Sequence, residues 1–287
     1  MKKIIALLCL ALIVTFGVTA TFAQKGKPLF PQAPGMQTYT FRNSMKVDVA
    51  ATLDSIKSLG ITVLESSTNP NGLTPEAFRK LLDARGMTSP SVGAGYEELV
   101  KDPAEVARKA KIIGASYVMT AWIPHQKEFT LADAQKAVAD FNRAGKILKE
   151  NGITFCYHTH GYEFIPYQNG TLFDYMVKNT NPEYVSFEMD ILWVFHGGGD
   201  PAKLLLKYPN RWKLMHLKDL RKGVKGDHTG GTSTDNDVAL GTGQLDLPAI
   251  LKAAKKVGVK YYFIEDESPK FRQQVPQTMA YLKSLKE

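Results

Sequence analysis

The sequence is poor in cysteine. Only Cys9 and Cys156 are present among 287 residues, and Cys9 falls inside an apolar run near the N-terminus. Once that run is removed, no intramolecular disulfide can form, so the hydrophobic core must stabilise the fold. We expect the remaining thiol, Cys156, to be a buried core residue rather than a nucleophile.

The sequence also lacks a basic tract, although its formal charge is +8. Two of these charges belong to Lys2 and Lys3, so the chain from residue 24 carries +6. The other lysines recur at helical spacing, as in 251–258, which is typical of solvated helix faces. Because no arginine-rich run and no basic run interleaved with aromatic residues is present, we predict no nucleic-acid partner.

The N-terminal residues have the layout of an export signal. Two lysines precede an apolar run over residues 4–18, and small residues then lead to Ala23. The run is shorter than the roughly 20 apolar residues needed to span a bilayer. We therefore predict a signal peptide at 1–23, a single domain at 24–287, and a periplasmic or secreted protein without stable membrane insertion after cleavage.

Short apolar runs alternate with amphipathic stretches from Gly35 to the end of the chain. Eight strand–helix pairs at roughly thirty-residue spacing predict an α/β fold, the (β/α)8 TIM barrel. The alternative, a doubly wound open sheet, is less favoured because no glycine-rich phosphate fingerprint follows the first strand. The predicted strands are 35–41, 61–66, 88–95, 115–122, 153–158, 184–190, 212–219 and 259–267.

A long segment, 221–246, interrupts this regular alternation. It is rich in glycine, threonine and aspartate, so it can bury little apolar surface. Loops of this length in compact domains are usually functional or disordered. We expect an active-site lid, and a flexible insertion is the alternative.

Ionisable side chains gather at the ends of the fifth to eighth predicted strands. The C-terminal ends of barrel strands open on one mouth, and residues i and i+2 of a strand share a face. Like charges brought together there resist desolvation, so a bound cation is the simplest explanation. Mixed carboxylate and imidazole ligands suit Mn²⁺, Co²⁺, Mg²⁺ or Zn²⁺. In strand order the groups are His158, His160 and Glu163, then Asp190, then His216 and Lys218, then Glu265.

Three further aromatic or imidazole residues lie near these strand ends. Trp193 follows Asp190 by three positions, so it is either a core residue or an apolar platform for a sugar face. His125 and His196 lie in predicted loops, and we interpret both as ordinary surface or rim residues.

Several motifs resemble one family over roughly residues 35–285. They are YHTHGYEF (157–164), FEMDILWVFHGGGDP (187–201), HLKD (216–219), GTGQLDLPAIL (241–251) and YYFIEDE (261–267). Together they look like the sugar phosphate isomerase/epimerase-like family of the xylose isomerase-like TIM barrel superfamily. The motifs are specific for the superfamily but not for a substrate, because its members include ketose epimerases, inosose dehydratases and enzymes that cleave 3-keto-glycosides.

The resemblance implies one divalent ion held by Glu, Asp, His and Glu from strands five to eight. Asp190, His216 and Glu265 match the last three positions. On strand five, Tyr157 stands where ketose epimerases carry a glutamate, so the first ligand is Glu163 or one of the two histidines. We assign Glu163 to the ion, and His158 and His160 to substrate contact or proton transfer.

The implied reaction is proton abstraction next to a sugar carbonyl, with the ion as a Lewis acid that stabilises the enediolate. Candidate acids and bases are Glu163, Glu265 and one of the histidines, His158 or His160. Lys218 is expected to stabilise oxyanion charge. The residues expected to contact the sugar are Gln37, Tyr39, Glu65 and Trp193.

Export shapes the expected substrate, because sugar phosphates are largely cytoplasmic. We predict a metal-dependent isomerase or epimerase that acts on an unphosphorylated sugar derivative. The alternatives are a 3-keto-glycoside lyase or hydrolase that releases an aglycone, and a non-catalytic carbohydrate-binding barrel. A related DNA-repair endonuclease would require a larger ligand set and an intracellular address. A homo-oligomer is left open by the sequence.

Overall fold

The computed structural model describes residues 26–30 and 32–287, so the predicted signal peptide lies outside the described residues. Eight parallel strands close into a barrel in the order β1-β12-β9-β8-β5-β4-β3-β2. The predicted (β/α)8 barrel is confirmed, and the open-sheet alternative is wrong. The barrel strands are β1 (Gly35–Gln37), β2 (Val63–Ser67), β3 (Thr88–Gly93), β4 (Tyr117–Thr120), β5 (Thr154–His158), β8 (Val185–Asp190), β9 (Trp212–Leu217) and β12 (Tyr261–Ile264).

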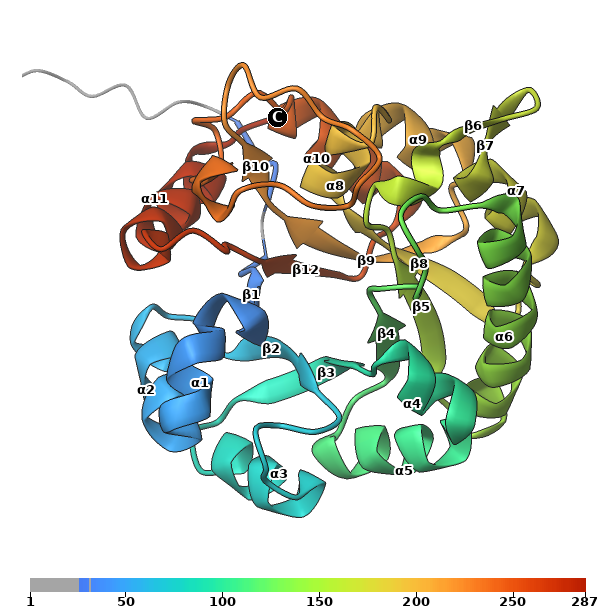
Figure 1. The fold of residues 1–287 in the computed structure, drawn as a ribbon. Coiled ribbons are helices and arrows are strands. Elements are labelled where there is room, and N and C mark those ends of the chain that lie inside the picture. The colour runs from blue at the N-terminus through green and yellow to red at the C-terminus, as the bar shows by residue number, and fades with distance from the viewer. Residues whose placement is uncertain (1–25, 31) are drawn as a thin grey trace, which may run out of the picture.

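The first and last strands close the barrel. Gly35 and Met36 of β1 pair with Phe263 and Ile264 of β12, so the blue and red ends of the chain lie side by side (Figure 1). A Cβ atom at Gly35 would stand 2.6 Å from Cδ1 of Phe263. This close approach explains why the closing strand begins with glycine.

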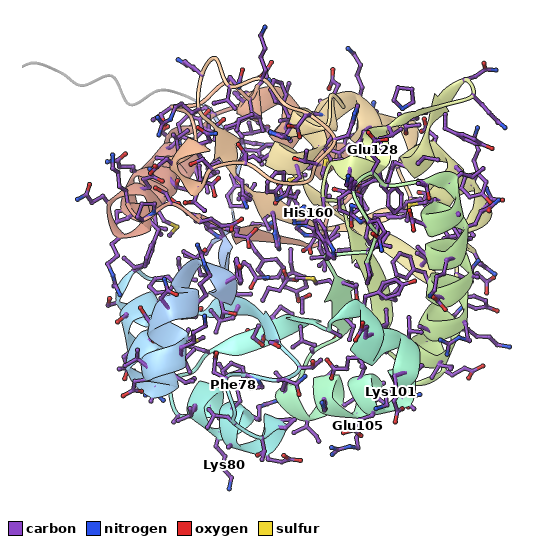
Figure 2. The ribbon with its side chains drawn as sticks, in the orientation of Figure 1. Phe78, Lys80, Lys101, Glu105, Glu128 and His160 are labelled. Atoms are coloured by element: carbon purple, nitrogen blue, oxygen red, sulfur yellow. The ribbon has the colours of Figure 1, made fainter. Side chains whose placement is uncertain are left out.

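The helices surround the barrel (Figure 1). In α3, the Thr74 hydroxyl caps the first turn and Pro75 occupies the first helical position. Its buried face carries Phe78, whereas Lys80 points outward (Figure 2). The helices are α1 (Arg42–Val47), α2 (Val49–Ser58), α3 (Pro75–Asp83), α4 (Tyr96–Lys101), α5 (Pro103–Ile113), α6 (Leu131–Glu150), α7 (Leu172–Asn179), α8 (Ile191–His196), α9 (Pro201–Lys207), α10 (Leu247–Val257) and α11 (Phe271–Ser284).

The first strand is shorter than the predicted 35–41. It ends at Gln37, and the 3-10 helix η1 (Thr38–Phe41) follows directly. The Gln37 side-chain oxygen accepts a hydrogen bond from the Tyr39 backbone N–H at 3.1 Å and so caps this turn. As a result Tyr39 lies at the barrel rim, where 51% of its surface is exposed.

The segment 221–246 is built around one buried carboxylate. Asp219 accepts backbone hydrogen bonds from Gly241, Gly243 and Leu245 at 3.0 to 3.2 Å. Within the region the short strands β10 (Asp219–Leu220) and β11 (Asp237–Val238) pair antiparallel. The hydrogen bonds to Asp219 and the pairing of β10 with β11 therefore both attach the segment to the residues that follow β9. The remaining short elements are β6 (Pro166–Tyr167), β7 (Gly170–Thr171), η2 (Tyr162–Phe164) and η3 (Thr234–Asn236).

A small apolar cluster fills the barrel beneath the polar mouth. It contains Met119, Cys156, Leu214 and Phe263. The last three each lie two residues before an ionisable residue at the mouth, so they form the layer directly beneath it. Cys156 is buried and free, as predicted. In the described part of the chain, no helix combines the length and the apolar character required to cross a membrane.

Candidate active site

Four adjacent strands of the barrel bring ionisable side chains to one mouth, as the sequence predicts. His158 ends β5, Asp190 ends β8, His216 lies one residue before the end of β9, and Glu265 directly follows β12. Strand pairing sets Asp190 directly opposite His216. All four side chains are buried, and a cavity of about 700 Å³ opens above His158, His216 and Glu265.

A buried carboxylate oxygen beside His158 and His216 has no hydrogen-bond partner. Oδ2 of Asp190 is buried and unpaired, 3.8 Å from Nε2 of His158 and 3.8 Å from Nδ1 of His216. The same Nδ1 lies 3.1 Å from Oε2 of Glu265. Ligands held about 2.1 Å from one ion lie about 3–4 Å from each other, so these separations fit a shared divalent cation. Burial raises the pKa of Asp190 to about 6 when no ion is bound.

Each of the two histidines uses its other nitrogen to contact a buried carboxylate. Nδ1 of His158 lies 3.2 Å from Oε2 of Glu188, and Nε2 of His216 lies 2.5 Å from Oε2 of Glu65. Glu188 also reaches Nε2 of His216 at 3.5 Å. Carboxylates behind metal-binding imidazoles orient the rings and select the tautomer. The two carboxylates thus stand where they can orient the imidazole rings.

Burial and the neighbouring Glu65 raise the pKa of Glu188 well above its usual range. Glu188 was not predicted from the sequence, although the strand pattern indicates that it faces inward. It precedes Asp190 by two positions in a strand, so both side chains face inward.

Gln37 and Glu65, both predicted to contact a sugar, are hydrogen-bonded to each other. Nε2 of Gln37 donates to Oε2 of Glu65 at 2.8 Å, and the Ser91 hydroxyl donates to the other oxygen of Glu65. Gln37 lines the cavity, whereas Glu65 lies behind His216 and does not. The structure thus places Gln37 within reach of a ligand and Glu65 beneath the imidazole.

Lys218 is a fully buried cation that also lines the cavity. Its Nζ lies 2.7 Å from Glu267, 3.2 Å from Glu265, 3.8 Å from Asp237 and 3.9 Å from Asp190. Burial opposes the charged form, but these carboxylates outweigh it and raise the pKa of Lys218 well above its usual value. The ammonium group is therefore a fixed positive charge beside the ion site.

Asp237 belongs to the long segment 221–246, so part of the expected lid is built into the site. Gly230–Thr234 of the same segment lines the cavity. Burial raises the pKa of Asp237 to about 8, and the backbone N–H of Glu267 donates to its carboxyl group at 2.8 Å. Asp237 and Glu267 were not singled out from sequence. Asp237 lies outside the barrel strands, whereas Glu267 falls in the predicted strand 259–267, two residues after Glu265, so its signal was available.

Glu163 lies apart from the cluster around Asp190. Its Oε1 accepts hydrogen bonds from the His160 backbone N–H at 2.8 Å and from the Tyr157 hydroxyl at 3.2 Å. Burial raises the pKa of Glu163 to about 7. Among the described residues, two groups bring three ligand atoms within 4.8 Å of one another: His158 with Asp190 and His216, and Glu65 with Glu188 and His216. Glu163 belongs to neither group and does not line the cavity.

His160 projects over the middle of the ring of elements (Figure 2). Its ring stacks on Trp193, with ring centres 4.7 Å apart, and its buried Nδ1 has no hydrogen-bond partner. Burial and the nearby Lys218 lower the pKa of His160 to about 4, so it is neutral near pH 7. Trp193 is 6% exposed and lines the cavity, so it serves both the core and the site. His196, expected at the surface, is instead 3% exposed, because α8 turns its ring inward.

The family profile described as xylose isomerase-like TIM barrel matches residues 53–285. The chain belongs to the xylose isomerase-like TIM barrel family. This agrees with the resemblance stated from the motifs.

Similar proteins of this family are sugar-modifying enzymes. An inosose dehydratase of Geobacillus kaustophilus is 30% identical over 98 residues, which are 34% of this chain and 31% of that enzyme. The chain therefore spans about a third of the length of the curated relatives that it matches. A sugar phosphate isomerase/epimerase structure from Parabacteroides distasonis is 25% identical, with a TM-score of 0.72 over 88% of this chain and 95% of that one.

Two more distant structural neighbours contain metal ions. The IolI protein was solved with a zinc atom, at 13% identity and a TM-score of 0.69 over 88% of this chain and 96% of that one. A Mycobacterium smegmatis barrel was solved with magnesium, at 14% identity and a TM-score of 0.69 over 89% of this chain and 97% of that one. At these identities the likeness shows the shared fold alone.

Proposed function

We propose that this barrel is a divalent-metal-dependent enzyme that removes a proton next to the carbonyl of an unphosphorylated sugar derivative. The observation that carries the proposal is the buried, unpaired Asp190 oxygen that faces two imidazole nitrogens. In this proposal His158, Asp190, His216 and Glu265 hold the ion, and His158 takes the strand-five position assigned to Glu163 from sequence. A bound divalent ion supplies a Lewis acid that stabilises negative charge on the substrate.

The side chains around the ion site have separate tasks in the proposed reaction. His160 lines the cavity and is neutral near pH 7, so it is available to accept the substrate proton. Lys218 remains charged, so it stabilises oxyanion charge as it develops. Gln37 is held by Glu65 at the cavity wall and offers a fixed hydrogen-bonding group to a sugar hydroxyl.

An unphosphorylated substrate is part of the proposal for two reasons. The N-terminal 1–23 segment has the features of a signal peptide, so we propose a periplasmic or secreted enzyme. The buried cation Lys218 is already paired with Glu265 and Glu267, so it is not free to bind a phosphate group. The same proton abstraction would serve isomerisation and epimerisation.

Elimination is a second candidate outcome of the same first step. The similarity to inosose dehydratases favours it, because a dehydratase expels a leaving group. In a 3-keto-glycoside the C3 carbonyl acidifies the proton on C2, and loss of that proton allows the C1 aglycone to leave. The same carbonyl-binding ion and the same base would be used.

Product analysis separates these outcomes. The Mn²⁺-loaded protein should be incubated with 4-nitrophenyl 3-keto-β-D-glucoside and, separately, with free ketoses such as fructose. Release of 4-nitrophenol supports elimination, and a new ketose epimer or aldose in the chromatogram supports epimerisation or isomerisation. Saturable sugar binding without any product would contradict the enzyme and favour the carbohydrate-binding barrel.

Glu188→Gln tests the proposed metal centre through its second layer. Glu188 contacts both histidines without touching the cavity, so this substitution should weaken retention of the ion about 10–100-fold. Metal content after dialysis and titration with Mn²⁺ measure the effect. The matched control is Glu183→Gln, because Glu183 is exposed and pairs only with Lys149. Equal ion affinity in the two variants would contradict an orienting role for Glu188.

A further inference from the structure

An outer aromatic subsite adjoins the proposed metal centre. Four large hydrophobic side chains are exposed among the described residues: Tyr39, Val47, Trp122 and Leu206. Two of them, Tyr39 and Trp122, line the same cavity as the ion site. They follow β1 and β4, which are separated by two strands around the barrel. Exposed aromatic area is therefore concentrated at the cavity mouth.

The indole of Trp122 is held in place rather than loosely exposed. One neighbour, His125, stacks on it with ring centres 4.9 Å apart, and Tyr162 meets it edge-on at 4.9 Å. The ring of His125 is itself fixed by contact with the Ile123 carbonyl at 2.7 Å, and it packs against the buried Phe129. Even so, 43% of Trp122 remains exposed. A rigid, half-exposed aromatic surface costs little ordering when a ligand stacks on it.

The cavity is larger than a single sugar ring requires. Even at the roughly 30 Å³ that a water molecule occupies in the liquid, the non-hydrogen atoms of a hexose would fill only about half of the 700 Å³. Trp122 is joined to the ion site by two ring contacts, to His160 at 5.1 Å and from there to His158 at 5.8 Å. Because Trp122, His160 and His158 line the same cavity, it can hold one ring at the ion site and a second ring beside the indole.

We infer that the substrate is a two-ring glycoside whose second ring stacks on Trp122. The inference rests on the proposed function and narrows its substrate class from any sugar derivative to a glycoside. Both an aryl ring and a sugar ring present a flat apolar face to an indole, and the binding experiment distinguishes the two. Because His125 and Tyr162 hold its ring in place, Trp122 can select the second ring of the ligand without touching the reacting atoms.

Equilibrium binding tests the subsite without relying on turnover. Calorimetric titration of the Mn²⁺-loaded protein should use phenyl β-D-glucoside, cellobiose and methyl β-D-glucoside. We expect Trp122→Ala to weaken binding of the preferred two-ring ligand about 10-fold and to change the methyl glucoside affinity less than about twofold. Trp122→Phe should retain most of the affinity. The control Leu206→Ala removes an equally exposed hydrophobic side chain outside the cavity and should leave all affinities unchanged.

The outcomes separate this inference from the proposed function. Stronger binding of phenyl glucoside identifies an aryl group as the second ring, and stronger binding of cellobiose identifies a sugar. The inference is overturned if Trp122→Ala leaves the two-ring affinities unchanged or weakens the methyl glucoside equally. Failure of the proposed function would appear instead as absent turnover of both the 3-keto-glycosides and the free ketoses while the Trp122-dependent binding difference persists.

Discussion

His216→Ala should abolish both ion retention and turnover. His216 contacts Glu265 and Asp190 through Nδ1 and two buried carboxylates through Nε2, so its loss removes a ligand and the link between the two layers. Loss of the ion's Lewis-acid contribution, worth several kcal/mol, corresponds to about a 1,000-fold or greater fall in kcat/KM. Metal analysis of the purified variant and initial rates on the active substrate measure both effects.

Two variants serve as controls for His216→Ala. His196→Ala removes another buried imidazole, one outside both ligand groups, and should retain the ion. Glu163→Gln removes the buried carboxylate of the strand-five region and should also retain the ion if His158 is the ligand there. Unfolding curves show whether each variant is folded. A folded His216→Ala protein with full activity and a normal ion content would refute the site.

Removal of the ion should inactivate the protein and lower its melting temperature. Without a cation, the carboxylates of Asp190, Glu188 and Glu265 remain buried close together, which is costly. An ion present at 100 times its dissociation constant stabilises the folded state by about 2.7 kcal/mol, which corresponds to a rise in Tm of roughly 5–10 °C. Dialysis against EDTA followed by activity and melting measurements checks this.

Add-back identifies the ion and controls for damage by the chelator. Mn²⁺, Co²⁺, Mg²⁺ and Zn²⁺ should be added separately, and the effective ion should restore both activity and Tm. Ca²⁺, which prefers six to eight oxygen ligands, should restore less because two of the four proposed ligands are nitrogens. Unchanged turnover and an unchanged Tm after complete chelation would remove the metal from the mechanism.

The inward-facing part of the site follows from strand periodicity. Residues two apart in a strand share a face, so the pattern alone places His158 above Cys156 and His216 above Leu214. The same rule puts Glu188 and Asp190 on one face of β8, because they are two residues apart. Glu188 could therefore have been predicted, whereas its contact with two histidines from neighbouring strands depends on register, which no single segment encodes.

Residues beyond the strand ends could not be placed by periodicity. Glu163 follows Gly161, whose φ of +97° turns the chain, and the resulting 3-10 turn directs the carboxylate back toward Tyr157. Asp237 reaches Lys218 only because the segment 221–246 folds back along β10. Such turns depend on long-range contacts, so their side-chain directions are not determined by local sequence.

The sequence by itself determined the barrel, the layer of ionisable groups at the ends of four adjacent strands, and the burial of Cys156. These features follow from the period of two in strands and from the shared mouth of parallel strands. Only the tertiary structure decided which nitrogen of each histidine faces the ion site, which carboxylates stand behind the histidines and around Lys218, and where Trp122 lies. Those contacts join residues far apart in the chain, and close packing around a single barrel axis sets their distances.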